Sequence, residues 1–257
     1  NRGHRLGPAP VLRTHLMEPH EQLPDVGILV CGRLGESMQP LAGGDYPVVY
    51  TALLRSADPT ITVRPYATID GELPERPDEC RSWIITGSPH DAFADDPWIV
   101  ELRRFVAEAV EAGARIVGVC FGHQVVAEAT GGRVERSDRW AVGPHEMTVE
   151  ATPWFAGDTV TINAMHRDVV TDLPADGRTI ATGTTGAVPA YIIGDTVLCV
   201  QDHPEFTGDL TRALIDRRRD LIGAEVADAA MAAIDERPTD GDTVARWIVD
   251  FLLDRRR

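Results

Sequence analysis

The segment Arg115–Gly132 constrains the fold more than any other part of this sequence. It opens with a short run, Arg115–Val119, that is wholly apolar after the arginine and is typical of a buried strand. The pattern G-x-C-x-G follows at Gly118–Gly122, and a helix over Gln124–Thr130 is predicted almost at once. A strand that turns directly into a helix predicts a tight, strained turn at the C-terminal edge of a sheet.

Strands and helices alternate through the first half of the chain. This alternation predicts right-handed crossovers and an α/β fold, with a parallel sheet that is covered by helices on both faces. Pro65 marks one strand as an edge strand. Strands are predicted at Gly27–Gly32, Ile61–Ala67, Ser82–Thr86 and Arg115–Val119, and helices at Tyr46–Ala57 and Pro97–Ala112.

The pattern changes after residue 132, where shorter β-like stretches follow one another. They lie at Arg133–Arg136, His145–Val149, Thr179–Thr182, Ala190–Ile193 and Val197–Val200, with a hairpin turn at 194–195. The last helix, Thr243–Leu253, has one apolar face, and we expect this face to cover the core of the chain itself. We divide the chain into a flexible arm (1–24), one domain (25–210) and a helical extension packed on that domain (211–257).

Charge and cysteine content exclude several classes of function. The formal net charge of −15 disfavours nucleic acid as a partner. The arginine clusters at 217–219 and 255–257 are short, and we interpret them as solvated faces or helix C-termini. The four cysteines form no C-x-x-C pair, so no zinc site is predicted. No apolar run reaches the ~18 residues of a membrane helix and no secretory signal is evident, so we expect a cytoplasmic location without membrane contact.

Cys120 is the candidate nucleophile. Its position at a helix N-terminus favours the reactive thiolate, because the helix dipole places partial positive charge there. The flanking glycines are expected because side chains at these positions would collide with the neighbouring strand and helix. The other three cysteines, Cys31, Cys80 and Cys199, are interpreted as structural.

A thiol nucleophile needs a base, and the base needs an orienting group. His203 and Glu205 follow a predicted strand in the segment VQDHPEF, and Pro204 between them stiffens the backbone. An oxyanion produced at Cys120 also needs N–H donors. Gly87 and Phe121 are the candidates, because Gly87 ends a neighbouring strand and Phe121 directly follows the nucleophile.

These segments together resemble the class I glutamine amidotransferase family, and within it the stand-alone branch that includes γ-glutamyl peptidases. The resemblance covers about residues 27–206. It is carried by TGSPHDAFADDPWI (86–99), CFGHQ (120–124), WAVGPH (140–145), MHRDV (165–169) and HPEF (203–206). It implies a three-layer flavodoxin-like sandwich with a mostly parallel central sheet and added C-terminal helices.

The resemblance also implies site residues and chemistry. Cys120, His203 and Glu205 form a catalytic triad, and Gln124, Ser88 and His166 contact the substrate, with Gln124 near the glutamyl α-carboxylate and His166 on a loop at the mouth. The substrate is a small γ-glutamyl compound, and no metal or organic cofactor is implied. Asp202 departs from the family, in which this position is often aromatic or glycine.

Several functions remain open at this point. The preferred one is a hydrolase that cleaves the γ-glutamyl amide bond of a peptide, conjugate or glutamine through a glutamyl thioester. A glutaminase subunit that delivers ammonia to a separate synthase uses the same triad. A non-catalytic regulatory protein that keeps the fold, and a general cysteine peptidase, are further alternatives. The sequence leaves open whether the protein has a synthase partner or forms a homo-oligomer.

Overall fold

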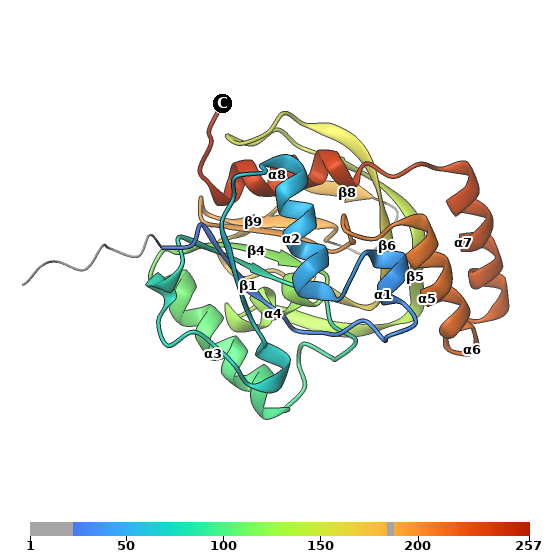
Figure 1. The fold of residues 1–257 in the computed structure, drawn as a ribbon, viewed down its shortest axis with the longest axis horizontal. Helices are drawn as coiled ribbons and strands as arrows, with labels where there is room; N and C mark the ends of the chain where they lie inside the picture. Colours follow the sequence, from blue (N-terminus) through green and yellow to red (C-terminus); the bar gives the residue numbers. More distant parts are fainter. Residues whose placement is uncertain (1–22, 184–187) are drawn as a thin grey trace, which may run out of the picture.

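A seven-stranded, mostly parallel sheet forms the centre of the molecule (Figure 1). The computed structural model describes residues 23–183 and 188–257, so the predicted arm at 1–24 falls almost wholly outside the described residues. In the order β2-β1-β3-β4-β10-β9-β7, the first five strands run parallel, and the pairings of β9 with β10 and with β7 are antiparallel. The strands are β1 (Val26–Leu29), β2 (Val63–Tyr66), β3 (Ser82–Ile85), β4 (Arg115–Val119), β7 (Gly177–Thr179), β9 (Ala190–Ile193) and β10 (Val197–Val200).

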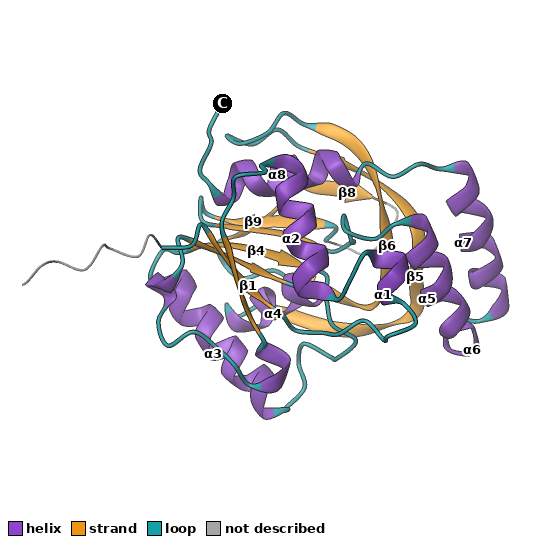
Figure 2. Cartoon of the chain, viewed as in Figure 1, coloured by secondary structure: helices purple, strands orange, loops and turns teal. Residues whose placement is uncertain are grey.

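Helices pack on both faces of this sheet, as the alternating sequence predicts (Figure 2). In β1, Val26 and Ile28 join a core with α2 (Tyr46–Ala57) and α8 (Gly241–Leu252), whereas Leu29 joins a core with α3 (Pro97–Glu111) and α4 (Phe121–Ala129). This division follows from the period of two along a strand, which sends successive side chains to opposite faces. The result is the expected three-layer sandwich, and β2 is an edge strand, as Pro65 predicts.

The second half of the chain differs from the prediction in its strands. The stretches Arg133–Arg136 and His145–Val149 belong to one long strand, β5 (Arg133–Val149), which continues through an irregularity between Arg136 and Ala141. β5 pairs with β6 (Asp158–Asp172), a strand that was not predicted. The strand predicted at Thr179–Thr182 is instead divided between β7 and β8 (Ala181–Gly183), of which β8 joins β5 and β6 in a separate sheet.

Helices also close the chain. They are α5 (Gly208–Arg217), α6 (Arg219–Ile222), α7 (Ala224–Glu236) and α8, while a short α1 (Gln39–Ala42) precedes α2. The predicted apolar face of α8 is buried at each of its five positions, Val244, Trp247, Ile248, Phe251 and Leu252. Its covering role is therefore confirmed. Over the described ranges, no helix has the length and hydropathy needed to cross a bilayer.

The turn between β4 and α4 is closely packed. α4 begins at Phe121, three residues before the predicted start at Gln124. A Cβ added to Gly118 would lie 2.6 Å from the carbonyl carbon and oxygen of Gly122, and one added to Gly122 would lie 2.4 Å from the carbonyl oxygen of Ile85. Since backbone atoms cannot move aside easily, both glycines are required for strand and helix to approach, as the G-x-C-x-G pattern predicts.

We expect Gly118→Ala to lower the free energy of unfolding by about 1–3 kcal/mol, the usual effect of overpacking. Urea denaturation monitored by circular dichroism would measure it, as a shift in the midpoint at constant slope. Gly35→Ala is the matched control. Gly35 is exposed, and its added Cβ would meet only the flexible end of the Arg217 side chain, at 2.9 Å. Equal effects of the two substitutions would contradict this account of the turn.

Candidate active site

Cys120 occupies a strained turn at the C-terminal end of β4. Its φ of 53° and ψ of −102° lie in a region that side-chain-bearing residues seldom adopt. Two backbone hydrogen bonds hold it there. The Cys120 N–H donates to the Val200 carbonyl at 3.0 Å, and the Gln124 N–H donates to the Cys120 carbonyl at 3.1 Å. The strain predicted from the sequence is therefore present at the candidate nucleophile.

The segment that carries His203 leaves the sheet at the end of β10, next to β4. Strand β6 fixes its path, because the His203 N–H donates to the Asn163 carbonyl at 2.8 Å and the Asn163 side chain donates to the Phe206 carbonyl at 2.8 Å. The His203 ring stacks on Phe206 with ring centroids 3.9 Å apart. Backbone and ring contacts together hold the imidazole in one orientation.

His203 links the thiol to a carboxylate. Its Nδ1 lies 2.7 Å from Oε1 of Glu205, and the ring also forms a hydrogen bond with Cys120. Burial alone would lower the pKa of His203, but the charges of Cys120 and Glu205 and the hydrogen bonds to them raise it from 6.5 to about 10. The ring therefore lies between a thiol and a carboxylate, which is the arrangement that nucleophilic catalysis by cysteine requires.

Tyr50 of α2 is part of the same network, and the sequence analysis did not identify it. Its hydroxyl donates to Oε1 of Glu205 at 2.8 Å and accepts the Gly87 N–H at 3.1 Å. Burial and the charge of Glu205 raise the pKa of Tyr50, so the hydroxyl stays protonated and acts as a donor to the carboxylate. Tyr50 lies within a regular amphipathic helix. The one feature of the sequence that could have identified it is a hydroxyl-bearing side chain on the buried face of that helix.

The two N–H groups that were expected to bind the oxyanion differ in whether they already have a hydrogen-bond acceptor. Phe121 is the first residue of α4, where an N–H group has no acceptor within the helix. The Gly87 N–H, in contrast, is already used by the Tyr50 hydroxyl, which argues against the expected role. Gly87 has another function in the packing: a Cβ there would lie 2.7 Å from Cε1 of His203, so the glycine gives the imidazole its space.

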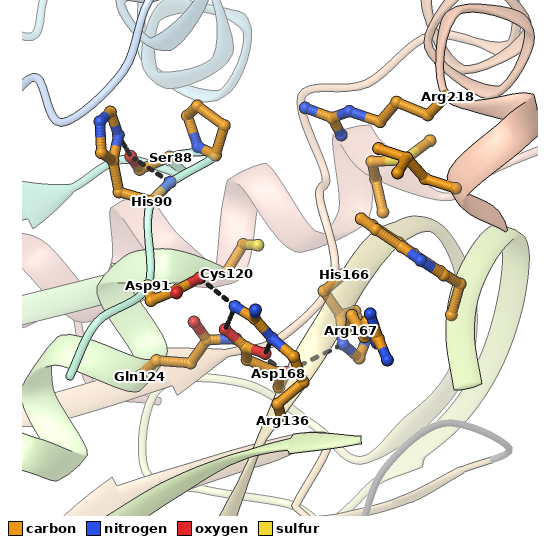
Figure 3. A pocket seen from close by; sticks show the side chains of 14 residues that line it. Ser88, His90, Asp91, Cys120, Gln124, Arg136, His166, Arg167, Asp168 and Arg218 are labelled. Carbon is orange, nitrogen blue, oxygen red and sulfur yellow. Dashed lines mark hydrogen bonds and ion pairs between the residues drawn. The ribbon is translucent and has the colours of Figure 1, made fainter. Parts of the chain in front are cut away.

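Cys120 opens into a cavity of about 420 Å³, which we call the Cys120 cavity (Figure 3). It brings together the three predicted substrate-binding residues, Gln124, Ser88 and His166. Gln124 is held by a hydrogen bond from Nε2 to the Asp168 carbonyl at 2.9 Å. The full lining is Ser88, Pro89, His90, Asp91, Cys120, Gln124, Arg136, Trp140, Met165, His166, Arg167, Asp168, Arg218 and Leu221.

His166 and Asp202 form a buried pair beside this cavity. His166 was expected on a loop, but it belongs to β6, with Nε2 3.2 Å from Oδ1 of Asp202. Burial would raise the pKa of Asp202, but the hydrogen bond and charge of His166, with His145 and His203 nearby, hold it below its usual value. The unusual aspartate is therefore compensated by histidines and does not line the cavity.

Comparison with known proteins shows which family and which relatives this chain resembles. Residues 49–218 match the family described as "Glutamine amidotransferase class-I". The chain is 33% identical over 224 residues to "Gamma-glutamyl peptidase 4" of Arabidopsis thaliana, a match that covers 81% of this chain and 88% of that protein. It is 32% identical over 142 residues to "GMP synthase [glutamine-hydrolyzing]" of Thermus thermophilus, covering 54% of this chain and 27% of that protein.

The fold has a solved counterpart. The crystal structure of a glutamine amido transferase from Methylobacillus flagellatus superimposes with a TM-score of 0.67 at 18% identity. The superposition covers 91% of this chain and 96% of that one. It confirms the flavodoxin-like architecture that the sequence implies.

We predict that Cys120→Ala lowers the pKa of His203 well below about 10, because the substitution removes the largest favourable charge while burial remains. Titration of the His203 ring by NMR would measure this. The wild-type imidazolium should persist to about pH 10, and the variant should deprotonate at lower pH. In a control variant, Cys80→Ala, the His203 titration should be unchanged. An unchanged pKa in Cys120→Ala would show that no thiolate faces the ring.

Proposed function

The chain belongs to the class-I glutamine amidotransferase family, and we propose that it is a Cys-His-Glu hydrolase that cleaves the γ-glutamyl amide bond of a peptide or conjugate. The observation that carries this proposal is the joining of Cys120, His203 and Glu205 by hydrogen bonds beside a cavity lined by Gln124. The similarity to a γ-glutamyl peptidase over most of both chains supports the substrate class.

The proposed reaction is acyl transfer in two steps. The Cys120 thiolate attacks the γ-carbonyl carbon, and the His203 imidazolium gives its proton to the leaving amine, which leaves a glutamyl thioester. The neutral His203 then takes a proton from water, whose oxygen attacks the thioester. Glutamate is released, the sulfur departs as thiolate, and His203 is again an imidazolium. Glu205 orients the ring and offsets its positive charge in both steps.

The oxyanion of each tetrahedral intermediate requires N–H donors. We propose the Phe121 N–H as one donor. For the second we propose the Ser88 N–H in place of that of Gly87, because the Gly87 N–H is bound to Tyr50. Within the described residues, the Ser88 N–H has no hydrogen-bond acceptor, and Ser88 lines the Cys120 cavity.

A glutaminase that passes ammonia to a separate synthase is the second candidate, and the similarity to a glutamine-hydrolysing GMP synthase favours it. This candidate differs in the leaving group and in the need for a partner. A non-catalytic regulatory role is disfavoured, because such a protein has no need of a buried imidazole between a cysteine thiol and a carboxylate. We also propose a cytoplasmic location, since all four cysteines are free thiols, as is usual in reducing compartments.

Substitutions in the triad test the mechanism. Cys120→Ser is expected to fold normally and to abolish hydrolysis, because a serine hydroxyl is not ionised by this environment. His203→Asn should lower kcat by at least ~10²-fold, the usual effect of losing acid–base catalysis, and Glu205→Gln should have a smaller effect. Cys80→Ala, which removes a buried thiol away from the cavity, serves as the control. Full turnover by Cys120→Ala would exclude the thioester mechanism.

The substrate separates the two candidate functions. We expect the isolated protein to release glutamate from a γ-glutamyl dipeptide with a higher kcat/KM than from glutamine. Glutamate release would be followed by a coupled assay with and without cell extract. Hydrolysis of glutamine that is faster than that of the dipeptide, and only in the presence of a co-purifying synthase, would replace the hydrolase with the glutaminase subunit.

A further inference from the structure

We propose that a second cavity, on the His203 side of the nucleophile, binds the leaving group, and that Arg217 and Arg218 there select leaving amines that carry a negative charge. This inference rests on the proposed function and specifies its substrate class: γ-glutamyl amino acids and short γ-glutamyl peptides with a free carboxylate. It also gives a role to an arginine cluster that the sequence alone assigned to a solvated helix end.

The second cavity, which we call the His203 cavity, has a volume of about 220 Å³. It shares Ser88, Pro89, Met165 and Arg218 with the Cys120 cavity, so the two meet beside the nucleophile. Gln124 lines only the Cys120 cavity, whereas His203 lines only the second one.

The position of the proton donor decides which part of a substrate each cavity holds. The leaving nitrogen must receive its proton from His203, so the group attached to this nitrogen extends into the His203 cavity. The glutamyl part then lies on the Gln124 side. Released ammonia is close in size to water, which occupies about 30 Å³. A cavity of about 220 Å³ therefore has room for a larger leaving group.

Arginine side chains give the lining of the His203 cavity a positive charge. Arg33, Arg217 and Arg218 contribute to the lining, and among the described residues none that line it is acidic. Arg33 is paired with Asp70. Arg217 and Arg218, in contrast, form no ion pair with any residue in 23–183 or 188–257, although the whole chain carries a net charge of −15. The neighbouring Arg219 is paired with Asp228 at 2.7 Å and lines neither cavity.

The fold brings both arginines to the cavity. The backbone N–H of Arg218 donates to the Leu214 carbonyl at 3.1 Å at the end of α5, and Figure 3 shows the Arg218 side chain extending to the cavity across from Cys120. The Arg217 guanidinium lies against Gly35, where an added Cβ would be 2.9 Å from Nη1. A helix C-terminus accounts for the presence of basic residues there, but not for two unpaired guanidinium groups that line the wall of a cavity.

The rest of the lining fits an organic leaving group. Leu34, Met38, Phe206 and Leu214 provide an apolar surface for the carbon skeleton of an amino acid. Arginine binds carboxylates through paired N–H donors, which gives these two residues a geometric preference for a terminal carboxylate over a neutral amide.

The test compares two substrates that differ only in this charge: a γ-glutamyl amino acid and the same compound with its terminal carboxylate converted to a carboxamide. For the wild-type protein we expect a kcat/KM ratio of acid to amide of at least ~10, the discrimination that one charge-assisted hydrogen bond provides. The ratio should fall at about 1 M salt, where the Debye length is only about 3 Å.

Variants assign this preference to the two arginines. The double variant Arg217→Gln/Arg218→Gln should bring the ratio close to 1, and the matched control Arg219→Gln should keep the wild-type ratio. A wild-type ratio near 1, or an undiminished ratio in the double variant, overturns the inference while the hydrolase function stands. Failure of the wild-type protein to cleave either substrate overturns both the inference and the proposed function.

Discussion

The close backbone contact between β4 and α4 sets the position of Cys120, around which the rest of the site is arranged. Because Gly118 and Gly122 lack side chains, the helix starts directly at the strand end, and Cys120 must adopt a positive φ. Cys120 is buried there and lines the Cys120 cavity. The neighbouring strand β10 then delivers His203, so the two reactive side chains meet because their strands are adjacent.

The sequence predicts most of the central sheet because β1, β3, β4, β9 and β10 are short, mainly apolar runs. The edge strand β7 was misplaced, because its three residues, Gly177–Thr179, form no such run. Strand β6 was not predicted, although residues 159–164 alternate polar and apolar, because Met165–Asp168 interrupts the alternation and His166 was assigned to a loop. Strand β5 was predicted as separate pieces because polar residues around its irregularity between Arg136 and Ala141 interrupt the alternation. Extended hairpins are set by pairing between distant residues, which a local pattern does not contain.

The same distinction applies to the site. Cys120, His203 and Glu205 stand in local motifs, and the structure joins them as these motifs suggest. Tyr50 has no motif, because its role depends on a contact with a residue 155 positions away. Gly87 is the opposite case. The sequence predicted its N–H as an oxyanion donor, but this N–H donates to the Tyr50 hydroxyl instead. Motifs therefore identify reactive groups, whereas the partners of these groups follow only from the folded chain.

The separation of Cys120 and His203 along the sequence also has a consequence for the order of events during synthesis. A ribosome adds about 5–20 residues per second, so several seconds pass between the emergence of Cys120 and that of His203. During this interval Cys120 has neither the imidazole of His203 nor the carboxylate of Glu205 beside it. The proposed triad is complete only when β10 joins the sheet next to β4. The order of residues along the chain thus places assembly of the proposed site late in the formation of the fold.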